Sequence, residues 1–320
     1  MSFREFLPYT PYDGNYFQQT LGELIQYSAG LIQVGIDGEA LSPEYYDRAR
    51  NAVNLAVLEM QAKGLHLSSY KLGYLFLQPD QGTYIIEDEN ATNTYFKRTL
   101  TAAEATAQTV LSVSDTTDLQ VADTIGIVLD DGSIQWTTVV SFDSVLLTVT
   151  VTDALTGDAA SGNYIYNYRE AIKQISRIHQ ILRRDNNVND VPLTMISQQE
   201  WDTLNNKSTS TGLPNQMYYQ RTIPKGTLKM WPVPQNSYSI VWFWYEQKLG
   251  QMKNQTDVMD LDQFYYPAFA YLCALRLCDV FAASTEMKMS IQQTYNELLA
   301  DAMRYDDEGT PIKISPNRRI

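Results

Sequence analysis

The sequence has few of the side chains that usually support catalysis or metal binding. Its 320 residues include two cysteines and two histidines. Cys273 and Cys278 are five residues apart, which places them about 140° apart around a helix, so we expect small buried side chains and no disulfide. His66 and His179 lie in different predicted elements, and neither has a second ligand at metal spacing. A chain without a disulfide framework fits synthesis in a reducing cytoplasm.

Catalytic and cofactor motifs are also missing. The sequence has no Gly-x-Ser-x-Gly elbow and no glycine loop that would cradle a phosphate. The pair Asp130-Asp131 is typical of a turn. The acidic run 87–90 has oxygen ligands for a hard cation, but it lacks the spacing of a calcium loop, which favours a solvated linker. We therefore predict no catalytic, cofactor-binding or metal-binding residues and no enzymatic activity.

Long apolar runs are absent as well. No stretch reaches the roughly 18 apolar residues that cross a bilayer. The first residues, Met-Ser-Phe-Arg-Glu-Phe, are not followed by the apolar segment of a signal peptide. We expect neither a signal peptide nor a membrane span.

Positive charge is scarce, and the imbalance is concentrated in one part of the chain. The 24 Lys and Arg residues against 37 Asp and Glu residues give a net charge of −13. Residues 87–168 hold twelve acidic and two basic residues, a charge of −10, which leaves −3 for the rest. A strongly acidic surface does not bind a phosphate backbone non-specifically. Five short β-branched runs separated by turns predict that 87–168 is an inserted acidic β domain, a small barrel or sandwich.

The remainder of the chain has mainly helical patterns. Apolar residues at helical spacing predict helices over about 17–33, 42–64, 169–184, 262–282 and 285–305. Strands are expected at 72–77 and 83–86, and the apolar run 239–247 predicts a strand covered on both faces. We therefore predict an α+β fold, with a helical bundle core and a short sheet formed by 1–86 and 169–308.

The C-terminal segment, 309–320, is basic on an otherwise acidic chain. Lys313, Arg318 and Arg319 carry the charge, and Ile312 and Ile314 alternate with polar residues. This alternation and the prolines favour an extended tail that docks on a partner by strand addition. The alternative is a frayed terminus.

Three segments in the second half of the chain resemble a known family. They are 192–201, 212–219 and 228–234, followed by an apolar strand and a helix rich in Ala and Leu. In this order they resemble the head-to-tail adaptors of short-tailed bacteriophages, the tail tubular protein A and packaged-DNA-stabilisation proteins. The resemblance covers about 1–86 and 169–305. Its interface-like residues are Trp201, Pro214, Tyr218, Tyr219, Trp231, Pro232 and Pro234.

The resemblance implies a structural role in the virion. Family members form a twelve-membered ring between the portal protein and the tail nozzle protein, and the genomic DNA passes through its lumen without specific binding. The family's C-terminal tail reaches the portal, a role that falls by position on 309–320. The inserted domain is outside the resemblance, and a tail fibre is one partner that it could hold.

Two other functions stay open at this point. One is a different virion component, such as a head-completion protein or a fibre-attachment collar. The other is a tail glycan hydrolase or lyase, which would need paired carboxylates in a cleft. The concentration of acidic residues in predicted turns argues against the second.

Overall fold

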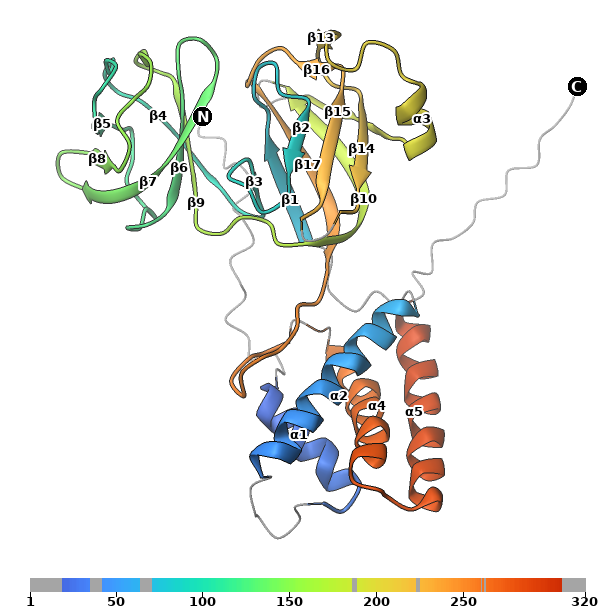
Figure 1. Cartoon of the computed structure of the whole chain (residues 1–320). Helices are drawn as coiled ribbons and strands as arrows, with labels where there is room; N and C mark the ends of the chain where they lie inside the picture. Colours follow the sequence, from blue (N-terminus) through green and yellow to red (C-terminus); the bar gives the residue numbers. More distant parts are fainter. Residues whose placement is uncertain are drawn as a thin grey trace, which may run out of the picture. The chain divides into compact units, whose positions relative to one another are not determined.

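The computed structural model describes residues 19–34, 42–63, 71–185, 189–222, 225–259, 261 and 263–306 (Figure 1). The described residues form two compact units. Residues 71–248 form the β unit. The described residues between 19 and 63 and between 249 and 306 form the helical unit. The predicted docking tail at 309–320 and His66 lie outside the described residues.

The predicted helical bundle core with a short sheet is wrong, because the larger unit is built almost entirely from β-sheets. Its first part is a sandwich of a five-stranded and a four-stranded sheet. The five-stranded sheet contains, in spatial order, β11 (Asn189–Pro192), β10 (Ile175–Asp185), β17 (Ser239–Gln247), β1 (Lys71–Phe76) and β3 (Ala91–Thr92). The four-stranded sheet contains β12 (Thr194–Met195), β14 (Gln216–Gln220), β15 (Thr227–Trp231) and β2 (Thr83–Ile85).

The two sheets share one core. Leu75, Phe243 and Ile181 point inward from the first sheet and meet Met217 and Met230 of the second. A short pair of strands, β13 (Thr211–Gly212) and β16 (Val233–Pro234), extends this part of the unit. A short helix, α3 (Gln198–Thr203), also belongs to it. Each sheet buries the residues on one face, which is why it needs the other.

The predicted helix at 169–184 is wrong for a specific reason. Ile175, Ile178 and Ile181 are three residues apart, a spacing that indicates a helix. They lie instead on strand β10, whose pairing with β17 shifts register after Ile175 and again after Ile178. Each shift adds one residue to the strand, so side chains three apart return to the same face. All three isoleucines are therefore buried in the sandwich core.

The second part of the β unit is a small barrel formed by the inserted segment. Its sheet contains, in spatial order, β4 (Phe96–Thr99), β9 (Tyr164–Tyr168), β6 (Thr124–Val128), β7 (Ile134–Asp143), β8 (Thr148–Val151) and β5 (Val110–Ser112). The outer strands β4 and β5 are joined where they continue into Leu100 and Val113, which pair. Thr101 N–H donates to Ser112 O at 2.9 Å across the same seam. Closure removes the exposed sheet edges.

Aromatic side chains join the barrel to the sandwich. Phe76 of β1 is fully buried and lies 4.7 Å from the Tyr166 ring and 5.2 Å from the Trp136 ring, centroid to centroid. Beside them, the Gln78 side chain bonds to the backbone of Ile134. Its Nε2 donates to Ile134 O and its Oε1 accepts from Ile134 N–H, both at 2.8 Å. The amide thus pairs with the edge of β7 as another strand would.

The helical unit contains α1 (Leu21–Leu31), α2 (Pro43–Ala62), the 3-10 turn η1 (Gln263–Tyr265), α4 (Tyr266–Val280) and α5 (Thr285–Asp306). Helix α1 begins with a capping box, in which Thr20 and Glu23 each satisfy the other's backbone N–H. Helix α4 is buried on most sides and forms the centre of the core, which includes Phe269, Leu272 and Leu277.

Candidate functional site

Trp201 and Tyr218, two of the predicted interface residues, are part of a packed cluster. Trp201 is held by α3, which begins at Ser197 with a capping box formed with Glu200. The Trp201 ring stacks on Tyr218 at 6.0 Å and 27° between planes. The Lys229 ammonium lies 5.9 Å from each ring. Because Trp201 is buried, its first role is to pack α3 against the four-stranded sheet.

The other predicted interface residues also support the sandwich from within. The Tyr219 hydroxyl donates to Ile175 O at 2.8 Å and so links the two sheets. Pro214 O accepts a hydrogen bond from the Arg183 guanidinium. Trp231 ends β15, Pro232 lies between β15 and β16, and Pro234 ends β16; each is buried or half-buried. The structure therefore brings these residues together in the same sandwich but exposes none of them fully.

An exposed aromatic face lies on the opposite sheet. Leu72, Tyr74, Leu182, Trp242 and Trp244 form two rows of paired residues across β10, β17 and β1, and we call them the tryptophan face. Trp244 is 37% exposed and the others are half-buried. The predicted coverage of the strand 239–247 on both faces is therefore wrong at Trp244. The alternation Trp-Phe-Trp at 242–244 was the sequence signal for this face.

Polar groups border the tryptophan face on one side. Arg184 and Asp190 form a two-point ion pair at 2.8 and 2.9 Å. The Trp242 indole N–H donates to the same Asp190 carboxylate at 3.2 Å. The hydrogen bonds from Arg184, the largest cause, lower the pKa of Asp190. Burial raises the pKa of the Tyr74 hydroxyl, which stays neutral.

A second exposed feature is the turn between β7 and β8 of the barrel. Val145 and Leu146 are 87% and 71% exposed. Asp143 Oδ1 accepts hydrogen bonds from the N–H groups of both residues, at 2.8 and 3.0 Å. These bonds lower the pKa of Asp143. The turn is thus ordered by its own carboxylate while it presents aliphatic side chains to solvent.

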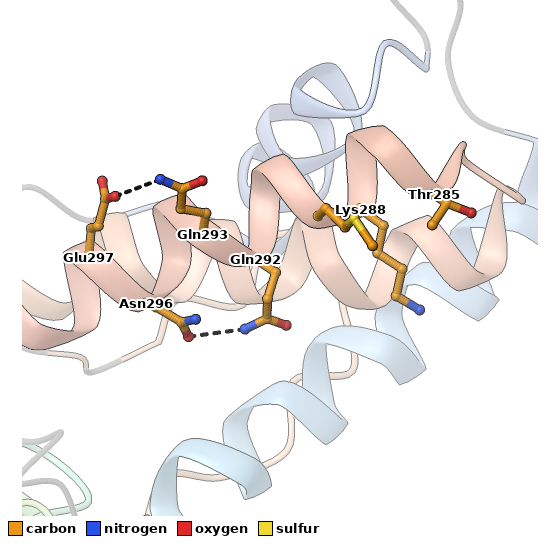
Figure 2. Close-up of a pocket in the computed structure, with 7 residues that line it drawn as sticks. Thr285, Lys288, Gln292, Gln293, Asn296 and Glu297 are labelled. Carbon is orange, nitrogen blue, oxygen red and sulfur yellow. Dashed lines mark hydrogen bonds between the residues drawn. The ribbon is translucent and has the colours of Figure 1, made fainter.

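The helical unit has exposed apolar residues on its outer surface. Leu55 and Leu58 of α2 are 61% and 54% exposed, although the opposite side of this helix carries its buried stripe. Met289 of α5 is also exposed. It borders an open depression of about 550 Å³ along α5, where Figure 2 shows Gln292 bonded to Asn296 and Gln293 bonded to Glu297.

Several titratable side chains form local hydrogen bonds or lie in the core. Hydrogen bonds with backbone and hydroxyl groups of nearby turns lower the pKa of Asp131 and Asp158, so these carboxylates are turn acceptors. His179 Nε2 lies 2.6 Å from Glu246 Oε1. Burial raises the pKa of the Cys273 thiol. Within the described residues, no three His, Cys, Asp or Glu side chains are grouped to hold a metal ion.

No helix in the described part of the chain has the length and apolar character needed to cross a membrane. No protein-family model matches this sequence, and no curated protein matches it.

Among solved structures, the chain is similar to the VP16–VP17 complex, a complex of the two major capsid proteins of bacteriophage P23-77. The identity is 10%, the alignment covers 60% of this chain and 86% of that chain, and the TM-score is 0.12. VP17, a capsid protein of the same bacteriophage, aligns at 13% identity over 60% of this chain and 84% of its own, also with a TM-score of 0.12. Scores this low do not establish a common fold, so nothing about this chain follows from them.

Proposed function

We propose that this chain is a structural protein of a bacteriophage virion, a head-to-tail adaptor that forms a ring between the portal and the tail nozzle. The resemblance of the segments 192–201, 212–219 and 228–234 supports this assignment. In the ring, the acidic surface lets genomic DNA pass without adhering to the wall. The protein would be made in the host cytoplasm and act at the head-tail junction of the virion.

The observation that carries the proposal is the pair of exposed leucines on the outer side of α2. Leu55 and Leu58 are exposed on a helix whose other side is already buried. Burying what remains exposed of each leucine contributes about 1–2 kcal/mol before the costs of association. A pair of such side chains repeated in every subunit stabilises side-by-side packing of helical units.

Self-assembly tests this role directly. We expect the chain to be monomeric or loosely associated alone and to form a ring on the portal protein encoded with it, as seen by sedimentation and negative-stain electron microscopy. The double variant Leu55→Asp, Leu58→Asp should keep its circular dichroism spectrum and melting temperature and lose the ring. Leu146→Asp, the same change at a leucine of the barrel that is 71% exposed, should leave the ring intact. A wild-type chain that stays monomeric with portal present would refute the proposal.

The C-terminal tail gives a separate test of portal binding. A chain that lacks 309–320 should fold normally and fail to co-sediment with the portal. Replacing Lys313, Arg318 and Arg319 with alanine should weaken binding in a salt-dependent manner, while Ile312→Ser and Ile314→Ser should weaken it at all salt concentrations. Normal portal binding by the truncated chain would remove the docking role.

A second candidate function is a fibre-attachment collar. The exposed aliphatic turn at Val145 and Leu146 favours it, because an ordered apolar tip fits a pocket of a partner. Cryo-microscopy of the virion separates the two functions by location. An adaptor lies directly against the portal, and a collar lies at the fibre bases.

A further inference from the structure

The tryptophan face is only partly covered along its length. At one end, the paired residues Phe76 and Ile240 continue the same rows and are almost fully buried against Tyr166 and Trp136 of the barrel. Two rows further, Trp244 is 37% exposed. The same face of the same three strands (Figure 1) therefore changes from a closed aromatic contact to an open one.

The first eighteen residues of the chain have the chemistry to cover this open part. Six of them are aromatic, a third of the segment, whereas aromatic residues make up 12% of the whole chain. The segment also contains Pro8-Tyr9-Thr10-Pro11. Prolines at this spacing favour an extended conformation, and such segments dock on surfaces lined with aromatic side chains.

Chain length places Phe3 and Phe6 within reach of the tryptophan face even when the linker from Trp244 to Asp257 is fully extended, and it places Tyr9 and Tyr12 within reach when that linker is shorter. Leu21 N–H donates to Asp257 O at 2.9 Å, so the start of α1 is fixed beside residue 257. Asp257 follows Trp244 by thirteen residues, which span at most about 45 Å. The eighteen residues from Leu21 back to Phe3 span up to about 60 Å.

The alternative segment of this chain is less suitable. Residues 307–320 include no aromatic residue, and they carry three basic and two acidic side chains. At the polar border of the tryptophan face, Arg184 and Asp190 already form an ion pair with each other. The border therefore does not favour a basic segment over an acidic one. An aromatic segment suits this face better, because stacked and edge-on ring pairs are favourable there.

We propose that residues 3–12 dock on the tryptophan face of the same chain, where their aromatic rings cover Trp242 and Trp244. The segment then acts as a strap that continues the aromatic contact between barrel and sandwich. This inference does not depend on the adaptor role, because it concerns a contact within one chain.

Photo-crosslinking in the full-length protein tests the strap. Tyr9 is replaced by p-benzoylphenylalanine, and equal amounts of 14N- and 15N-labelled protein are mixed before irradiation. Mass spectrometry should find crosslinks to peptides that contain 71–76 or 239–247, in pairs of the same isotope. Crosslinks only to other segments, mixed-isotope pairs in half of the products, or no crosslink at all would overturn the proposal.

Variants test whether the crosslink depends on the tryptophan face and on the prolines of the strap. Trp244→Ala should lower the crosslink yield at least fivefold, and Trp244→Phe should retain most of it, because an aromatic ring is kept. Pro8→Ala with Pro11→Ala changes only the strap and should also lower the yield. Val145→Ala, at the exposed turn of the barrel, is the matched control and should leave the yield unchanged. Unchanged yields in both Trp244→Ala and the proline variant would overturn the proposal even if a crosslink is found.

Discussion

Replacing Phe76 with alanine should weaken the contact between barrel and sandwich more than any change at the surface of either part. Phe76 is fully buried, and its ring lies within 5.3 Å of the rings of Tyr95, Trp136 and Tyr166. Truncating a buried phenylalanine costs about 3–5 kcal/mol. Loss of three favourable ring pairs places the expected value in the upper part of that range.

The loss is large compared with the stability of a typical domain. Native domains are stable by about 5–15 kcal/mol, and a urea m-value for a unit of this size is about 2–3 kcal/mol per molar. A loss of about 4 kcal/mol therefore lowers the urea midpoint by about 1.3–2 M. Because Phe76 joins two separate cores, we also expect the single transition to divide into two.

Urea denaturation of the full-length chain, followed by tryptophan fluorescence and by far-ultraviolet circular dichroism, measures this effect. The matched control is Phe142→Ala, which removes the same ring from the exposed end of β7 and should cost less than about 1 kcal/mol. A loss below about 1 kcal/mol for Phe76→Ala, or one equal to the control, would show that the aromatic contact does not hold the two parts together.

Three further predictions concern other elements of the structure. Gln78→Ala should cost about 1–3 kcal/mol of unfolding free energy in a urea titration, because the backbone N–H and C=O of Ile134 lose their partners. Gln81→Ala, at a half-buried position nearby whose amide bonds to Thr83 O in the same turn, should cost less. Asp143 has a lowered pKa, so its stabilisation of the turn is present above the ordinary aspartate pKa of about 3.9 and is lost as the pH falls through the lower folded value. Hydrogen-exchange protection of the Leu146 amide should therefore persist at pH 5, decline only below about pH 4, and be absent at all pH values in Asp143→Ala; protection in that variant equal to wild type would contradict this. Cys273 is fully buried with a raised pKa, so iodoacetamide should label it only after unfolding in urea, and rapid labelling of the native protein would show that the core of the helical unit opens.

The parts of the fold that the sequence predicts well are those in which local pattern and tertiary structure agree. The segments 17–33, 42–64, 262–282 and 285–305 each contain a helix, because their apolar stripes face a core that other helices complete. The acidic segment 87–168 contains strands and turns and no helix, because its apolar runs are short, β-branched and separated by turn residues. In both cases the residues that determine the element are close together in the chain.

The candidate surfaces were much less predictable. Trp201 and Tyr218 are predicted to lie at an interface with a partner, and within the single chain they pack against each other and under Lys229. An aromatic residue in a strand has the same local pattern whether its face is buried by its own chain or left open. The pairing of β17 with β10 and β1 decides that Trp242 and Trp244 lie on the outer face. Trp242 pairs with Leu182, 60 residues earlier in the chain, and with Tyr74, 168 residues earlier.

The sequence by itself determined where helices form before residue 64 and after residue 261, and that the acidic segment is rich in short strands. Those properties depend on composition and on spacing over a few residues. Only the tertiary structure decided that β10 is a strand, because its two register shifts exist only when β17 is beside it. Likewise, only the folded β unit decided that Phe76 is covered by the barrel while Trp244, two rows further along the same face, stays open to solvent. Burial is a property of what lies opposite a residue, and for these strands the opposite side comes from a distant part of the chain.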